Sequence, residues 1–417
     1  MAQRTFGRVG VWILFAGILA SAAVPAGAKT VVRLMLWGDG KAYEPIIEAF
    51  EQKYPDIEVE VELTSFGNYF DRLQIQAAAG VAADVIRVNG AFLGGLAAAG
   101  IIEEMQPWID AAGIDLDEYM PTGDIFWYKG KLYGLGNQYD LVGLLYNKDA
   151  FSARGLTAPA DDWTWAELRD AAARLTVRSD EHVEQYGVTM YANATYWGQA
   201  SWVNFLAQNG VRILDESKSR AAFNTPAGIE AIEFMRSFVV EDRSAPPVEQ
   251  VYAWEFGQAK VAMDFTIMPN SFQNLRESAS FEWNIAPLPV GKERAAVTNT
   301  VGFALNATSQ VKEAAWTLIE FLVTEGQMIA GRDRLFMPTY RPAVFEYIDP
   351  NEAPTRFLDV LNVSSPYAVD LQFTPSWSQW SSVLGTRISE AVSGTRSVES
   401  ALEEAQRQVN AILADES

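Results

Sequence analysis

Apolar and polar residues alternate along the chain in blocks that predict strands and helices in turn. Val31 to Trp37 is a compact apolar run that ends at a Gly-Asp-Gly turn, which predicts a buried strand. The next block repeats apolar residues at helical spacing and stops at Pro55. Residues 57–63 and 84–88 predict two more strands, separated by a helix over 69–79. Strands that alternate with helices predict βαβ units and a largely parallel sheet, so the fold class is α/β.

The same pattern returns in the middle and at the end of the chain. Residues 165–175, 225–239, 385–392 and 398–413 carry apolar residues at helical spacing, and 261–265 and 283–288 predict short strands. No linker rich in Pro or Ser separates the two series. We therefore expect two domains that are connected by short strands, with ligand sites in the loops that follow the carboxyl ends of the strands.

The first 28 residues have the pattern of an export signal. Arg4 and Arg8 precede an apolar run over 11–24, and Ala26-Gly27-Ala28 fits the small-x-small cleavage pattern. A membrane anchor is the alternative, but the run is shorter than the roughly 20 residues that span a bilayer. Cleavage after Ala28 would leave 417 − 28 = 389 residues and, with two arginines removed, a net charge of −21 − 2 = −23.

Composition narrows the function classes. A chain of 417 residues exceeds what one hydrophobic core usually serves, which favours two domains. Its acidic balance argues against partners that are nucleic acids or anionic lipid surfaces. The chain has no Cys, so a lipid anchor on cysteine is excluded, and a free periplasmic protein is expected. One histidine, His182, leaves no zinc site and no supported catalytic triad, so we expect no metal and no cofactor.

Six segments in order resemble the extracellular solute-binding proteins of the sugar type, which include maltose-binding proteins. The strongest piece pairs Gly-Lys-Leu-Tyr-Gly-Leu with Gly-Leu-Leu-Tyr-Asn-Lys, and Gln138 stands between them where the family usually has a smaller residue. The segments are 130–148, 83–85, 164–168, 256–263, 283–289 and 313–316.

This resemblance implies a two-lobed periplasmic binding protein fold, with discontinuous lobes joined by hinge strands around a ligand cleft. The expected divisions are 1–28 as signal peptide, 29–140 and 300–342 as the first lobe, and 141–299 and 343–417 as the second. The expected crossings lie near 138–143, 298–302 and 340–345. The resemblance also implies a monomeric substrate-binding component of an ABC importer, which captures a sugar or related polar solute and delivers it to a membrane permease.

Carboxylates, amides and aromatic rings are the side chains that bind sugar hydroxyls and C–H faces. Asp140 lies in an apolar crossing strand, where a lone carboxylate is costly to bury, and it aligns with an acidic ligand contact of the maltose type. An ion pair across the hinge is its alternative. Asp264 ends a predicted strand beside the cleft by analogy.

The other candidate contacts each have a structural alternative. Asp39 and Asn89 follow strands and would otherwise form turns or helix caps. Phe66 would otherwise pack in the core, and Arg341, which could bind an anionic group, would otherwise form a salt bridge between the lobes. Candidate stacking rings are Trp197 and Trp202 in a loop before a helix, and Trp377 or Trp380 before the helix at 385–392, with the other ring packing.

Three other functions remain open. An anionic polyol such as glycerol phosphate, or a sulfonated sugar, would give Arg341 a larger role. A secreted glycoside hydrolase would use Asp140 and Asp264 as its carboxylate pair. A surface scaffold module would need no enclosed cleft. The order of the family segments favours the binding protein over both of the last two.

Overall fold

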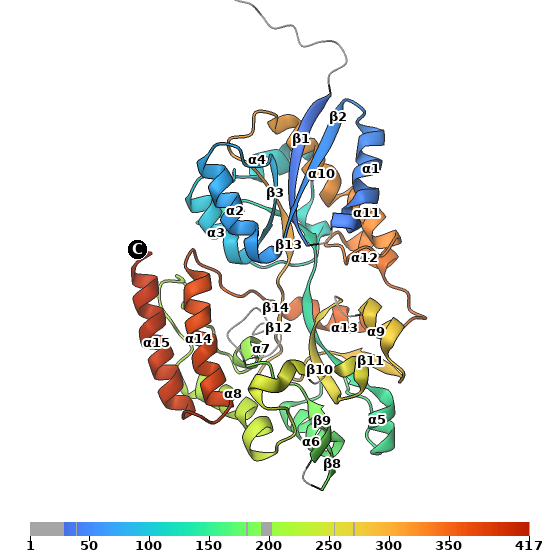
Figure 1. Ribbon diagram of the computed structural model, residues 1–417, viewed down its shortest axis with the longest axis vertical. Helices are drawn as coiled ribbons and strands as arrows, with labels where there is room; N and C mark the ends of the chain where they lie inside the picture. The colour runs from blue at the N-terminus through green and yellow to red at the C-terminus, as the bar shows by residue number, and fades with distance from the viewer. Residues whose placement is uncertain are drawn as a thin grey trace, which may run out of the picture.

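The computed structural model describes residues 29–38, 40–180, 182–192, 202–253, 255–269 and 272–416. Asp39 and Trp197 lie outside these residues. The described chain forms two α/β lobes, one above the other in Figure 1, and each lobe is built around one five-stranded sheet. Buried apolar side chains form two clusters that largely follow this division, although the cluster of the second lobe also takes in Met120, Met337 and Val344 from the first. The two-lobed α/β prediction is confirmed.

The sheet of the first lobe has the order β2-β1-β3-β13-β6. The strands β1, β2 and β3 are parallel as predicted, because helices return the chain between them. The strand β13 comes from much later in the sequence and runs antiparallel to both of its neighbours. The elements of this lobe are β1 (Thr30–Trp37), α1 (Glu44–Lys53), β2 (Ile57–Thr64), α2 (Phe66–Ala78), β3 (Val85–Asn89), α3 (Gly90–Ala98), α4 (Gln106–Ala112), β4 (Trp127–Tyr128), β5 (Lys131–Leu132), β6 (Leu135–Gln138), β13 (Val301–Leu305), α10 (Lys312–Val323), α11 (Glu325–Arg332) and α12 (Arg341–Tyr347).

The sheet of the second lobe has the order β11-β7-β10-β9-β8 and is mixed rather than parallel. Of its pairs, only β10 with β9 is parallel. Its elements are β7 (Leu141–Asn147), α5 (Lys148–Ala153), α6 (Trp165–Leu175), β8 (Val177–Ser179), β9 (His182–Val188), α7 (Trp202–Gln208), α8 (Pro226–Arg236), β10 (Val261–Met268), α9 (Phe272–Ser278), β11 (Trp283–Ala286), β12 (Ala296–Val297), α13 (Phe357–Ser364), β14 (Ala368–Val369), α14 (Trp377–Val392) and α15 (Val398–Ala414).

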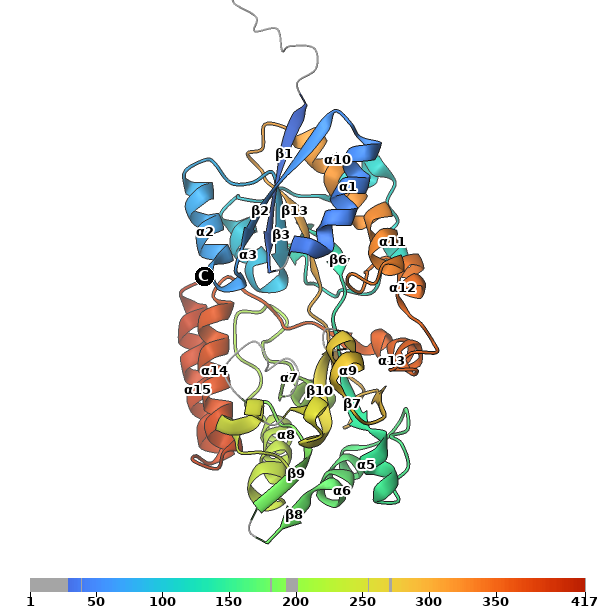
Figure 2. The same cartoon turned by 45° about the vertical axis from the view of Figure 1, so that its right-hand side comes forward.

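The chain passes between the lobes at three places. It leaves the first sheet after β6 and enters the second at β7, and it returns between β12 and β13. The third passage differs from the expected 340–345, because those residues belong to the helix α12, which packs against α11 of the first lobe. Residues 348–356 instead carry the chain down to α13 (Figure 2). Met268-Pro269 and Ala353-Pro354 are cis peptide bonds.

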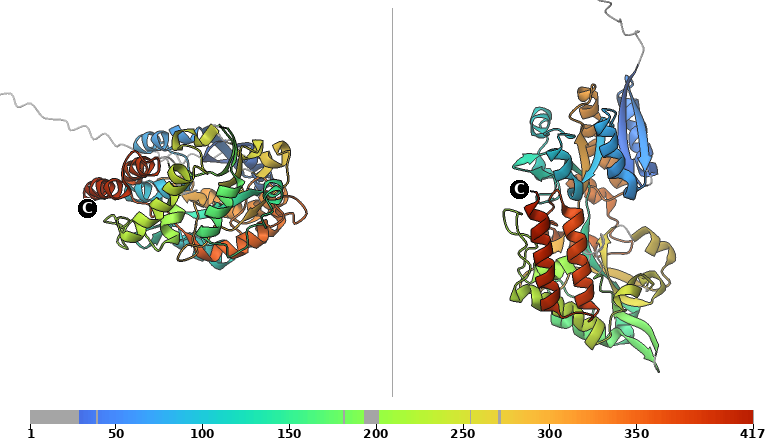
Figure 3. Two further views of the ribbon diagram at one scale, coloured as in Figure 1. Left: turned by 90° about the horizontal axis from the view of Figure 1, so that it is seen from below. Right: turned by 60° about the vertical axis from the view of Figure 1, so that its left-hand side comes forward.

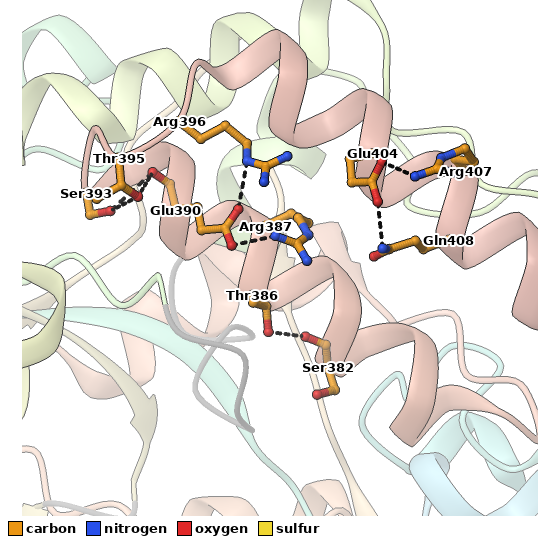
Figure 4. Close-up of polar contacts among 10 residues, drawn as sticks. All are labelled: Ser382, Thr386, Arg387, Glu390, Ser393, Thr395, Arg396, Glu404, Arg407 and Gln408. Atoms are coloured by element: carbon orange, nitrogen blue, oxygen red, sulfur yellow. Dashed lines mark hydrogen bonds and ion pairs between the residues drawn. The ribbon is translucent and has the colours of Figure 1, made fainter.

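The last two helices, α14 and α15, lie side by side and flank the second lobe (Figure 3). The helix α14 begins at Trp377, not near Gly385, so Trp377 and Trp380 lie within its first turns. Glu390 of α14 forms ion pairs with Arg387 at 2.5 Å and Arg396 at 2.9 Å, while Glu404 of α15 pairs with Arg407 (Figure 4). These ion pairs lie on the polar sides of the two helices. The apolar stripe of α15 faces the core, as predicted.

Candidate functional site

A cavity of about 820 Å³ lies between the two lobes beside the hinge passages. Its size is within the range of about 300–1,000 Å³ that is usual for small-ligand sites. Its wall joins the ends of the first-lobe strands to the loop after β10 and to α9 of the second lobe. The lining residues are Trp37, Gly38, Ala42, Tyr43, Arg87, Gln138, Pro269, Gln273, Arg276, Glu277, Asp333, Arg334, Leu335, Phe336, Met337, Tyr347 and Glu352.

Arg87 is the most deeply buried charged residue on this wall, with 7 % of its surface exposed. Its guanidinium lies 4.4 Å from the ring centre of Trp37 and 5.5 Å from that of Tyr43, within the range of cation–π attraction. It donates to the carbonyl of Trp37 at 3.2 Å and to Oε1 of Gln138 at 2.8 Å. Among the described residues no carboxylate lies within ion-pair distance of it, and its Nε has no hydrogen-bond partner.

The other two arginines of the wall are neutralised locally. Arg334 pairs with Glu352 at 2.5 Å and with Asp349 at 3.3 Å. Arg276 lies 3.5 Å from Glu352 and donates to the carbonyl of Ala353 at 2.7 Å. The uncompensated positive charge of the wall is therefore that of Arg87.

Asp140 lies between β6 and β7, where the chain crosses the hinge, and 3 % of its surface is exposed. Burial raises the pKa of its carboxyl from 3.8 to about 7, partly offset by a hydrogen bond from Gln138 and by the charge of Arg87. Its Oδ1 has no hydrogen-bond partner within the described chain. The backbone carbonyl accepts from the hydroxyl of Thr298 at 2.8 Å, which ties the first passage to the second. The alternative of an ion pair across the hinge is not what the structure contains, since no cation lies within 4.0 Å in the described residues.

Asp264 lies in β10 and is partly buried. Its Oδ1 accepts from the hydroxyl of Thr189 at 2.5 Å and from that of Tyr191 at 2.9 Å. Burial raises the pKa of this carboxyl to about 6, offset in part by those two hydrogen bonds. The structure places Asp264 in the second-lobe sheet and not among the residues that line the cavity.

Asn89 and Phe66 lie near the site in the first lobe. Asn89 is 2 % exposed and directly precedes α3, but its side chain caps no backbone N–H and its Oδ1 has no partner, so the helix-cap alternative is wrong. Phe66 is 40 % exposed, so full core packing is also wrong for it. Its ring meets the ring of Trp37 edge-on at 5.6 Å, which places it at the margin of the cavity.

Besides Asp264, three of the predicted contacts do not line this cavity. Trp202 is 5 % exposed and packs in the second core cluster as the first residue of α7. Arg341 is exposed and donates through Nε to the carbonyl of Tyr119 at 3.1 Å. It therefore neither lines the cavity as an anion-binding residue nor forms the alternative salt bridge between the lobes within the described residues. Trp377 is partly buried against Phe373 at 5.2 Å, and Trp380 packs in the core as one of the pair was expected to do.

Arg87, Gln138, Trp37 and Tyr43 were not among the sequence candidates. The sequence contains a signal for two of these residues, Arg87 and Gln138. Arg87 interrupts the apolar strand Val85-Ile86-Arg87-Val88 two residues before Asn89, and a charged residue in a buried strand needs a partner or a function. Gln138 lies within 130–148, the segment that carries the strongest part of the family resemblance.

No metal site and no membrane span are found in the described ranges. They contain no cluster of three side chains able to hold a metal ion. Their helices include none that is long and apolar enough to cross a membrane.

Two relatives match the chain at low identity. A binding protein of Brucella abortus (strain 2308) is 24% identical over 412 residues, which cover 95% of each chain. The sn-glycerol-3-phosphate-binding periplasmic protein UgpB of Pectobacterium atrosepticum is 24% identical over 299 residues, 66% of this chain and 64% of its own.

Two solved structures share the fold along almost the whole chain. The ABC substrate-binding protein Lmo0181 of Listeria monocytogenes, in complex with cycloalternan, matches with a TM-score of 0.80 at 24% identity and covers 93% of this chain and 99% of that one. An ABC transporter solute-binding protein of Thermotoga lettingae, bound with alpha-D-tagatose, matches with a TM-score of 0.77 at 26% identity and covers 92% and 100%.

The family model described as bacterial extracellular solute-binding protein matches residues 37–329. That range contains both hinge passages around Asp140 and about half of the first-lobe wall of the cavity. The chain therefore belongs to the bacterial extracellular solute-binding protein family.

Proposed function

We propose that this protein captures a neutral sugar or a related polyhydroxyl solute between its lobes and presents it to the membrane permease of an ABC importer. The observation that carries the proposal is the cavity between the lobes, whose wall combines aromatic rings with a buried arginine and, next to it, a buried carboxylate. Rings stack on the C–H faces of sugars, and charged groups bind their hydroxyls. The sugar-bound structures of the same fold support this proposal.

An anionic polyol such as glycerol phosphate is the second candidate. Arg87 favours it, because its charge has no ion-pair partner among the described residues. The similarity to a glycerol-phosphate-binding protein supports it over part of the chain. Arg341, which gave rise to this alternative in the sequence, does not, because it lies away from the cavity.

Several further properties belong to the same proposal. We expect the mature chain to begin at Lys29 without a lipid, to act in the periplasm as a monomer and to have no enzymatic activity of its own. We also propose that the lobes comprise 29–140 with 300–347 and 141–299 with 357–417. This division moves the last boundary past α12 because that helix packs against α11.

A ligand panel tests the function. The mature protein is screened by thermal shift against maltose, D-tagatose, other neutral sugars and sn-glycerol 3-phosphate. A ligand at 100 times its Kd adds about 2.7 kcal/mol of stability. Small-angle scattering should then give a smaller radius of gyration with the bound sugar, because a ligand that touches both lobes favours closure. The absence of any sugar among the binders would refute the proposal.

A further inference from the structure

Glu352 lies in the third passage between the lobes and forms part of the cavity wall. Its Oε2 lies 2.5 Å from Nη1 of Arg334, which follows α11 in the first lobe, and 3.5 Å from Nε of Arg276, which belongs to α9 in the second lobe. Both arginines also line the cavity. One carboxylate oxygen thus connects a cation of each lobe, and we call these three residues the Glu352 bridge.

The passage is held by a different lobe on each side of Glu352. Before it, the carboxylate of Asp349 lies 3.3 Å from Nη2 of Arg334, which ties this part to the first lobe. After it, the hydroxyl of Thr355 accepts from the amide of Asn284 in β11 at 2.9 Å, which ties that part to the second lobe. A movement of one lobe relative to the other therefore has to change at least one contact of Glu352.

No other ion pair between described residues reaches both lobes. Apart from the pairs of Arg334 and Arg276, each joins residues of one lobe, and that of Arg356 ties the passage to the second lobe alone. The members of the bridge are partly exposed, so salt weakens their attraction and their effect on overall stability is small. A small effect is sufficient where two positions of the lobes differ little in free energy.

The charges of the bridge predict the direction of the effect. With Glu352 in place, its negative charge attracts both guanidinium groups and favours the approach of the lobes at this edge of the cavity. Without it, two like charges from opposite lobes face each other, and Asp349 compensates only that of Arg334. Their repulsion would favour a wider cleft.

We propose that the Glu352 bridge is an electrostatic clasp, so that the resting width of the cleft in the free protein depends on salt and on this one carboxylate. The inference goes beyond ligand capture, because it concerns the protein before any ligand binds. A clasp of partly exposed pairs changes the ratio of narrow to wide clefts by about twofold to fivefold, which leaves the lobes free to open.

Distances between spin labels test the clasp in the mature protein without ligand. The chain has no cysteine, so Gln52→Cys on α1 and Ser152→Cys on α5, both at exposed positions, label one helix of each lobe. Between 0.01 M and 1 M salt the Debye length falls from about 30 Å to about 3 Å. The population with the shorter distance should fall about twofold to fivefold over this range. In Glu352→Gln it should already be low at 0.01 M salt and should fall no further.

Glu277→Gln is the matched control. Glu277 lies in α9 on the same cavity wall, and no cation lies within ion-pair distance of it among the described residues. The control removes the same charge, so its distances and their salt dependence should equal those of the labelled protein with Glu277 intact. Equal shifts in both variants, or no shift in Glu352→Gln, would overturn the clasp.

A double variant separates repulsion from a general loss of structure. Adding Arg276→Gln to Glu352→Gln removes one of the two like charges, so part of the population with the shorter distance should return. A structural defect would instead grow with the second substitution. If none of that population returned, the electrostatic mechanism would be wrong.

Affinity connects the clasp to the proposed function. For each sugar that binds, Kd should rise in Glu352→Gln by about the same twofold to fivefold factor, because fewer molecules have the narrow cleft that binds it. An unchanged Kd beside changed distances would overturn this connection. If no sugar binds, the proposed function fails, and the distances still decide whether the clasp exists.

Discussion

Asp140 and Asp264 are buried carboxylates, one at the hinge and one in the second-lobe sheet, and their surroundings differ. Asp264 is partly exposed, yet its Oδ1 already accepts two hydroxyl hydrogen bonds from its own lobe. Asp140 is nearly fully buried, yet its Oδ1 accepts none. In both cases burial raises the pKa. We therefore propose that Asp264, which its own lobe satisfies, serves stability, and that Asp140 is the one of the two that contacts a ligand.

The largest expected effect is on the pH dependence of stability. Burial raises the pKa of Asp140 from 3.8 to about 7, so between these values the folded state binds more protons than the unfolded state. The stability from this group is therefore complete below about pH 4 and is lost as the pH rises to about 7. Asp140→Asn does not titrate, so its stability relative to the wild type should increase by about 3 kcal/mol between pH 4 and pH 7. Urea unfolding at pH 4, 5.5 and 7 measures this, and a constant difference would contradict it.

The second effect should come from Asp264→Ala. At pH 5 the folded carboxyl, with its pKa of about 6, is mostly neutral, so no buried charge complicates the result. The variant loses two hydrogen bonds and some buried volume, which should cost about 2–3 kcal/mol of unfolding free energy. Urea unfolding at pH 5 checks this. If the free energy of unfolding fell by less than about 0.5 kcal/mol, as for a typical surface substitution, the hydrogen bonds to Asp264 would not stabilise its lobe.

The third effect concerns sugar affinity, which should depend on Asp140 but not on Asp264. Asp140→Asn replaces an acceptor with a donor, so binding of the best sugar in the panel should weaken at least tenfold, about 1.4 kcal/mol. Asp264→Asn is the matched control and should leave calorimetric affinity within about twofold. The reverse pattern would exchange the roles that we assign to them.

The smallest effect concerns a single donor to Asp264. Thr189→Val keeps the side-chain shape but removes the hydroxyl that lies 2.5 Å from Oδ1. The loss of one hydrogen bond should cost about 1 kcal/mol at pH 5, measured by urea unfolding. Ligand affinity should not change, and a change of tenfold or more would place this hydrogen bond at the binding site.

The spacing of apolar residues, glycines and prolines was sufficient to predict the α/β class and several elements, while the two-lobed arrangement came from the resemblance to the family. The strands β1, β2 and β3 and the helix α6 lie where apolar spacing, glycine and proline predicted them. The mixed second sheet was not predicted, because strand direction depends on pairing between distant segments and leaves no local pattern. The third passage was misplaced for a related reason, since the packing of α12 on α11 is a tertiary contact.

The site was predicted less well than the fold. Asp140 was selected because a carboxylate in an apolar segment is conspicuous, and the structure places it at the hinge beside Gln138 of the cavity wall. Trp202 and Arg341 were selected by residue type and local position alone, and the structure gives each a local partner instead. Arg87 was overlooked, although it too is a charged residue in an apolar strand. Its hydrogen-bond partner Gln138 comes 51 positions later in the sequence, so no local pattern points to the contact.

The position of β13 has a consequence for the order of biosynthesis. This strand lies between β3 and β6 in the first sheet, but its last residue, Leu305, is made 167 residues after Gln138. At about 5–20 residues per second the ribosome needs about 10–30 s to cover that distance. During this time the strand that lies between β3 and β6 is missing, so the first lobe cannot complete its sheet. The first lobe thus stays incomplete, with β3 and β6 lacking the strand between them, while residues 139–300 are being made.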